Sequence, residues 1–200
     1  YFREAIANYL KDWCEENGYD LYSSGLKIYT TIDTRMQKYA EDAAKKQMKQ
    51  VQQNFNNHWG IYRNQTSNWL RQDPWQDENH QVIPNFIQQI AERQPFYKAL
   101  LARFPNNPDS VNYYYKEWKH PVKVFDYDKG TVIKEMTSED SIKYMTTFMH
   151  CAFVAMEPQT GAVKAWVGDI DFNSWKYDKV TAMRQPGSTF KLFVYTEAMN

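Results

Sequence analysis

Cysteine is scarce in this chain of 200 residues, which contains only Cys14 and Cys151. Two thiols are too few for a disulfide framework, so packing and hydrogen bonds must hold the fold. Cys151 lies in an apolar run that is typical of a buried strand, and Cys14 lies in an expected helix. We expect both to be free thiols.

An excess of charge of either sign is also missing, because 24 Lys and Arg residues balance 24 Asp and Glu residues. Without a basic stripe, the sequence gives no electrostatic support for nucleic-acid binding. The four histidines lie far apart and share no ligand spacing, which argues against a metal site.

Long hydrophobic runs are absent as well. The longest, Cys151 to Met156, falls far short of the ~18 residues of a membrane-spanning helix. The chain opens on Tyr1-Phe2-Arg3-Glu4 rather than on a leader peptide. We therefore expect it to be one section of a longer protein.

Apolar spacing predicts an α+β arrangement of helices and short antiparallel strands. Asp33 or Thr34 is expected to cap the second helix, and Ser138 the last one before the strands. The Lys- and Gln-rich face of the second helix is expected to be mostly solvated. The expected helices cover about 3–16, 34–55 and 138–150, and the expected strands cover 26–32, 121–125, 131–136, 153–156 and 162–167.

The composition changes between Asn54 and Lys119, where Asn, Gln and aromatic residues replace aliphatic ones. Amide richness alone would fit a disordered segment, but the aromatic side chains supply large areas for burial. Two helices broken at Pro95 are expected here. We divide the chain into a linker region with the first strand and helix (1–45), an inserted helical module (46–119) and a third domain (120–200).

Near the end of the chain, Ser188 and Lys191 form an S-x-x-K pair within the string R-Q-P-G-S-T-F-K. Positions i and i+3 share a helix face, so the lysine amine can reach the serine hydroxyl. A serine needs an adjacent base to become a nucleophile, and a lysine in a dry pocket can lose its proton and act as that base. Pro186-Gly187 supplies a turn before the serine, where free N–H groups of a helix N-terminus favour a developing oxyanion.

This string resembles the active-site serine segment of penicillin-binding transpeptidases. Two further stretches are similar to the same family in the same order: G-L-K-I-Y-T-T-I-D at 25–33 and F-V-A-M-E-P-Q-T-G-A-V-K-A-W-V-G at 153–168. Together they resemble a class A, bifunctional penicillin-binding protein between its glycosyltransferase domain and its transpeptidase active site. The resemblance implies that 120–200 is the N-terminal portion of the transpeptidase domain and that a membrane anchor lies upstream.

The resemblance implies a DD-transpeptidase that cross-links peptidoglycan stem peptides through an acyl-serine intermediate, at the periplasmic face of the inner membrane. Ser188 would be the nucleophile, which β-lactams also acylate, and Lys191 would be the base. No cofactor or metal is implied. The family's S-x-N and K-T-G motifs are absent from these residues, so we expect this chain by itself to be inactive.

Two alternatives stay open. A serine β-lactamase or β-lactam sensor also carries S-x-x-K, but places it much nearer the mature N-terminus. A non-catalytic docking module is the alternative from another class: the aromatic segment 54–119 would contact a periplasmic or outer-membrane protein partner.

Three aspartate side chains precede the expected nucleophile. Asp169, Asp171 and Asp178 lie in the segment that leads to Ser188. A general-acid role is conceivable, but a solvated loop is the favoured interpretation. Arg184 is expected to orient a loop at least as readily as a substrate carboxylate.

Overall fold

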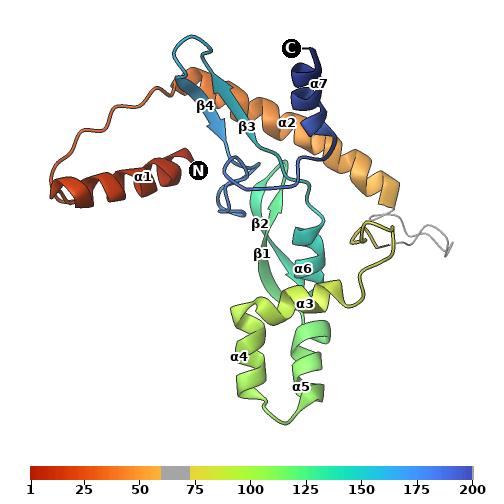
Figure 1. The fold of residues 1–200 in the computed structure, drawn as a ribbon. Helices are drawn as coiled ribbons and strands as arrows, with labels where there is room; N and C mark the ends of the chain where they lie inside the picture. Colours follow the sequence, from red (N-terminus) through yellow and green to blue (C-terminus); the bar gives the residue numbers. More distant parts are fainter. Residues whose placement is uncertain (60–72, 200) are drawn as a thin grey trace.

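The computed structural model describes residues 1–59 and 73–199. Long α2 lies beside the β3–β4 pair, and α3, α4 and α5 form a helical lobe at the opposite end of the molecule (Figure 1). Both strand pairs are antiparallel, which agrees with the predicted α+β class. The elements are α1 (Phe2–Asn17), α2 (Thr34–Trp59), α3 (Phe86–Arg93), α4 (Pro95–Arg103), α5 (Pro108–Asn112), the π-helical segment η2 (Tyr113–Glu117), β1 (His120–Asp126), β2 (Gly130–Met136), α6 (Ser138–Thr146), β3 (Phe153–Met156), β4 (Val163–Val167), the 3₁₀ turn η3 (Gly187–Phe190) and α7 (Lys191–Met199).

The end of α1 and the start of α2 lie where their local chemistry predicts, whereas α2 continues to Trp59, past the predicted end near residue 55. α1 ends at Gly18, which adopts the left-handed conformation with φ 71° that a side chain disfavours. The Asp33 carboxylate accepts hydrogen bonds from the N–H groups of Arg35 and Met36 at 2.9 and 3.2 Å. This cap satisfies N–H groups that the first turn of α2 would leave without a partner.

The strand predicted over 26–32 is wrong, since this segment is extended but forms no ladder. It runs beside β4, where Asp33 N–H donates to the Lys164 carbonyl at 3.0 Å and the Thr31 hydroxyl donates to the Val163 carbonyl at 2.7 Å. One backbone bond is too few to make a third strand. The alternating pattern therefore corresponds to an extended segment that lacks the pairing that defines a strand, and Ile28 on its apolar face stays 49% exposed.

The helical lobe has a core of its own, built from Ala91, Tyr97, Val111 and Tyr115. Pro95 breaks the chain between α3 and α4 as predicted, because proline fits the first turn of a helix but not its interior. Leu100, Phe104 and Ile142 pack against this core. Ile142 belongs to α6, so the lobe and the hairpin region that follows share contacts.

The β1–β2 hairpin has the predicted turn, with Gly130 at φ 72° and the Asp126 carboxylate accepting from the N–H groups of Asp128 and Lys129. Two boundaries of the next helix differ from expectation. The capping side chain is Thr137, one residue before the predicted Ser138, and its hydroxyl accepts from the Asp140 N–H at 3.1 Å. α6 also ends at Thr146 rather than near residue 150.

A second, aromatic core joins the hairpin to the C-terminal segments. Phe125 is 1% exposed, and its ring lies 5.5 Å from that of Phe148 and 5.2 Å from that of Trp175. β3 and β4 pair next to it through the predicted turn at 157–161. Both cysteines are free: Cys14 is buried, as a small apolar side chain would be, whereas Cys151 is only half-buried.

Candidate active site

Ser188 lies in η3, and Lys191 begins α7, so the pair spans a junction between a 3₁₀ turn and an α-helix. Gly187 adopts φ 55°, which lets the chain turn sharply after Pro186. Side chains at i and i+3 are eclipsed in 3₁₀ geometry, so both residues lie on the same side of the turn. In the part of the chain that the structure describes, no hydrogen bond joins the Ser188 hydroxyl to the Lys191 amine.

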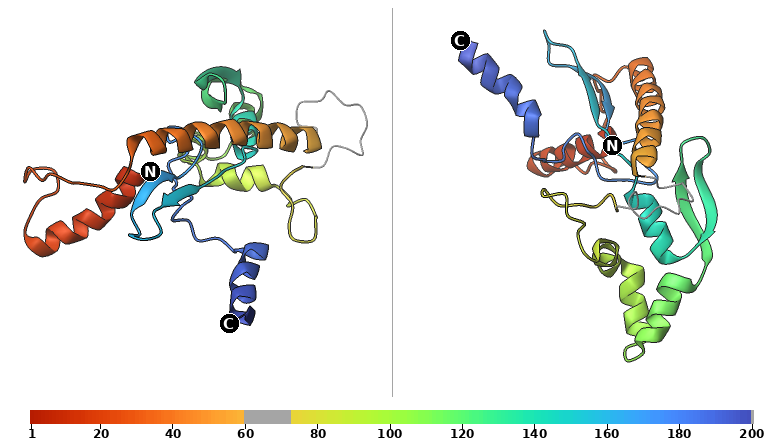
Figure 2. Two further views of the ribbon diagram at one scale, coloured as in Figure 1. Left: turned by 90° about the horizontal axis from the view of Figure 1, so that it is seen from above. Right: turned by 90° about the vertical axis from the view of Figure 1, so that its right-hand side faces the viewer.

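The surroundings of this pair are open to solvent. No residue of η3 or α7 is buried, and large apolar side chains of α7 are among the most exposed in the molecule, with Leu192 at 69% and Phe193 at 66%. Figure 2 shows α7 at the edge of the molecule, away from the helical lobe. A lysine base requires a dry environment to hold a neutral amine. The described residues do not provide one around Lys191.

One carboxylate of the loop that leads to Ser188 differs from the prediction of a solvated side chain, because Asp169 is buried. Its side chain has no exposed surface, and Oδ1 accepts a hydrogen bond from the Ile170 N–H at 2.8 Å. Oδ2 lies 2.8 Å from Nδ1 of His150 and 3.4 Å from Nζ of Lys179. The sequence did not predict this burial, because the two basic partners, His150 and Lys179, are distant from Asp169 in the sequence.

Comparisons with known proteins match nearly the whole described chain. Residues 70–149 match the model of the penicillin-binding protein middle domain, and residues 151–200 match that of the penicillin binding protein transpeptidase domain. The chain is 28% identical to penicillin-binding protein 1A of Neisseria flavescens over 92% of its length and 31% identical to that of Rickettsia typhi over 90%. No solved structure matched the chain.

The chain belongs to the class A penicillin-binding proteins. It spans about a quarter of the length of the relatives that it matches, 25% for the Neisseria flavescens protein and 23% for the Rickettsia typhi protein. The middle-domain match takes in the helical lobe together with the β1–β2 hairpin and α6. The segment 54–119, for which the sequence alone suggested no family, therefore lies mostly within a domain of this family.

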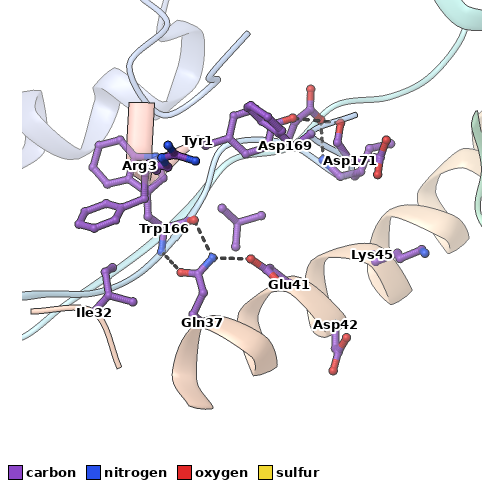
Figure 3. A pocket seen from close by; sticks show the side chains of 14 residues that line it. Tyr1, Arg3, Ile32, Gln37, Glu41, Asp42, Lys45, Trp166, Asp169 and Asp171 are labelled. Atoms are coloured by element: carbon purple, nitrogen blue, oxygen red, sulfur yellow. Dashed lines mark hydrogen bonds between the residues drawn. The ribbon is translucent and has the colours of Figure 1, made fainter. Parts of the chain in front are cut away.

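Two glutamines of this penicillin-binding protein carry contacts that the sequence analysis missed. The Gln37 amide accepts from the Trp166 N–H at 2.7 Å and donates to the Trp166 carbonyl at 2.9 Å (Figure 3). Gln52, which is 5% exposed, accepts from the Met149 N–H at 2.7 Å and donates to the Thr147 carbonyl at 2.9 Å. Each amide thus satisfies a donor and an acceptor of a neighbouring segment.

A sequence signal for these glutamines exists in retrospect. Gln37 and Gln52 continue the stripe Ala40, Ala44 and Met48 at helical spacing, one at each end. The Lys- and Gln-rich face predicted to be solvated therefore does not include every glutamine of α2. Polar residues that extend an apolar stripe are candidates for buried hydrogen-bonding groups.

The cavity next to Gln37 has a volume of about 470 Å³ and lies between the start of α1, the first turns of α2 and the end of β4. Glu41 and Asp42 come from α2, whereas Asp169 and Asp171 come from the loop after β4 (Figure 3). Neither Ser188 nor Lys191 lines this cavity. Within residues 1–59 and 73–199, no group of three metal-ligating side chains occurs and no helix is long and apolar enough to cross a membrane.

Proposed function

We propose that this chain is part of a peptidoglycan synthase and that Ser188 is the acyl-accepting nucleophile of its DD-transpeptidase domain. The observation that carries the proposal is the string Arg184–Lys191, which lies within the transpeptidase match and places Ser188 and Lys191 on one side of a turn that opens a helix. The middle-domain match supports a synthase over a β-lactamase or β-lactam sensor. This assignment places the protein at the periplasmic face of the inner membrane.

In the proposed reaction, Lys191 Nζ takes the proton from Ser188 Oγ as the oxygen attacks the carbonyl carbon between the two D-Ala residues of a stem peptide. The C–N bond breaks, and the terminal D-Ala leaves as an amine that recovers the proton. An amine of a neighbouring stem peptide then attacks the acyl-serine ester and releases Ser188. N–H groups at the start of a helix are suited to stabilise the oxyanion of each tetrahedral intermediate. β-Lactams would acylate the same oxygen.

We further propose that the 200-residue chain is inactive by itself. The reason is the exposure of η3 and α7, whose apolar side chains have no cover within the described residues. A lysine needs dry surroundings to act as a base, and the described residues do not provide them around Lys191. The complete synthase would have to supply the dry surroundings and further substrate contacts.

The test is labelling of the complete synthase with a fluorescent penicillin, followed by mass spectrometry of the labelled peptide. We expect the adduct on Ser188, its loss in Ser188→Ala, and a fall of about 100-fold or more in Lys191→Arg, because arginine keeps the charge but cannot deprotonate. Ser174→Ala and Lys176→Arg in the preceding loop are matched controls that should label normally. An adduct on another residue, or normal labelling of Ser188→Ala, would refute the assignment.

We also propose a docking role for 54–119, supported by aromatic side chains on the helical lobe. Phe104 stacks on Tyr114 with ring centres 5.3 Å apart, and Trp118 stacks on His120 at 4.6 Å. Tyr113 and Trp118 are 48% and 44% exposed. Exposed aromatic residues on a rigid support are favoured in protein interfaces, so a periplasmic or outer-membrane protein is the proposed partner.

A further inference from the structure

Three segments that are distant in the sequence meet at the buried Asp169 carboxylate. Asp169 follows β4 by two residues, His150 lies between α6 and β3, and Lys179 lies on the returning arm of the loop before Ser188. We call these three residues the Asp169 cluster. Figure 3 shows Asp169 between Tyr1 and Asp171.

The Asp169 carboxylate is more deeply buried than the carboxylates of the other ion pairs among the described residues. The Asp169 side chain is 0% exposed, that of Lys179 is 14% exposed and that of His150 is 32% exposed, whereas Lys164 and Glu157, 3.8 Å apart, are 32% and 43% exposed. A buried carboxylate is costly to desolvate, and removing one partner leaves an uncompensated charge. Burial, followed by the charge of Asp169, raises the pKa of the neighbouring Cys151 thiol. The cluster therefore lies where water screens charges poorly.

Besides these ion-pair contacts, hydrogen bonds fix the returning arm to the end of β4. The Lys179 N–H donates to the Gly168 carbonyl at 2.8 Å, and Trp166 Nε1 donates to Asp178 Oδ2 at 2.8 Å. The Thr181 hydroxyl donates to the Asp178 carbonyl at 3.4 Å. This last bond lies within the arm itself, so among the described residues the hydrogen bonds that join the arm to the end of β4 stop at Lys179, nine positions before Ser188.

We propose that Asp169 is a positioning residue for the nucleophile: its buried carboxylate holds His150 and Lys179 together and so sets the direction in which the chain enters η3. This proposal rests on the proposed function of Ser188. Asp169 does not touch the reacting atoms and acts through Lys179 and the arm that follows it. A serine displaced by about 1 Å from its attacking position loses roughly 100-fold in rate.

The test uses the complete synthase and separates the acylation rate constant from the penicillin dissociation constant by stopped-flow fluorescence. Asp169→Asn should lower the acylation rate constant about 10- to 100-fold, with little change in the dissociation constant. Lys179→Arg keeps the buried cation and should acylate within a few-fold of the wild type. Glu157→Gln and Lys164→Arg alter the exposed pair and serve as controls with unchanged rates.

Hydrogen exchange supplies a readout that does not depend on catalysis. In Asp169→Asn, amides of 170–186 should exchange faster while those of β1 and β2 keep their protection. If Asp169→Asn does not fold, the double variant Asp169→Asn/Lys179→Gln replaces it, because removing both charges leaves no unpaired buried ion. This double variant should melt like the wild type and still acylate slowly.

The outcomes separate this proposal from the one on which it rests. Normal acylation of the wild type together with normal acylation of Asp169→Asn or of the double variant overturns the positioning role alone. Equal loss of protection in β1, β2 and 170–186 also overturns it, because Asp169 would then only stabilise the whole fold. A wild-type synthase that takes no penicillin on Ser188 overturns the proposed function and this inference together.

Discussion

Replacing Gln52 by leucine tests how much a buried amide contributes to the attachment of α2. The Gln52 side chain is 5% exposed and bonds the Thr147 carbonyl and the Met149 N–H, which lie in the segment between α6 and β3. Leucine has a similar size but neither donates nor accepts. The substitution therefore leaves one backbone acceptor and one backbone donor without their partner, and it also removes the bond from Gln52 Nε2 to Asn56 Oδ1 at 2.9 Å.

The magnitude follows from two opposing terms. A buried polar group left without a partner costs about 1–3 kcal/mol, and two such groups are created. Burying the leucine side chain returns about 1.5–3 kcal/mol. Because Thr147 and Met149 are only partly buried, water can hydrogen-bond their freed backbone groups and lower the free-energy cost. We expect the free energy of unfolding to fall by about 1–2 kcal/mol.

Urea unfolding of the chain measures this loss, and hydrogen exchange of the Met149 amide locates it. Gln53→Leu is the matched control, because Gln53 is the adjacent and exposed glutamine of the same helix. It should change stability by no more than about 0.5 kcal/mol. Equal stabilities for the two variants, or a Met149 amide that exchanges at the wild-type rate in Gln52→Leu, would refute the reasoning.

Two further predictions concern the buried tyrosines and the exposed aromatic residues of 54–119. Burial raises the pKa of Tyr115 and Tyr127 above its ordinary value, so the stability that each neutral phenol contributes is complete below about pH 10 and is lost as the pH rises further. The loss of stability above about pH 10, measured by circular dichroism, should therefore be smaller in Tyr127→Phe than in the wild type. An unchanged pH dependence of unfolding would contradict this. For the docking proposal, replacing Tyr113 and Trp118 by serine should leave penicillin labelling intact but lower peptidoglycan cross-linking in cells; unchanged cross-linking would count against a partner at this surface.

Local chemistry predicted the elements whose boundaries depend on neighbouring residues. The Asp33 cap, the break at Pro95 and the glycine turn at Gly130 each satisfy or exclude a backbone conformation within a few residues, so the sequence pattern is sufficient. The extended segment 26–32 failed as a strand because strand pairing requires a distant partner with free N–H and C=O groups in register. Alternation alone cannot supply that partner.

The S-x-x-K pair shows that the candidate site, like the fold, has features set by neighbouring residues and features set by distant ones. Ser188 and Lys191 are visible in the sequence because their relation is a spacing of three residues. Asp169 was expected to be solvated, since its partners His150 and Lys179 lie 19 residues before it and 10 after it. The β3–β4 pairing brings the segment of His150 to Asp169, and the bond from the Lys179 N–H to the Gly168 carbonyl brings Lys179. The spacing of a motif identifies which side chains can react. Their position in space depends on contacts between segments that are distant in the sequence. If Asp169 positions Ser188 as proposed, the residues that set the rate of this site need not lie within its motif.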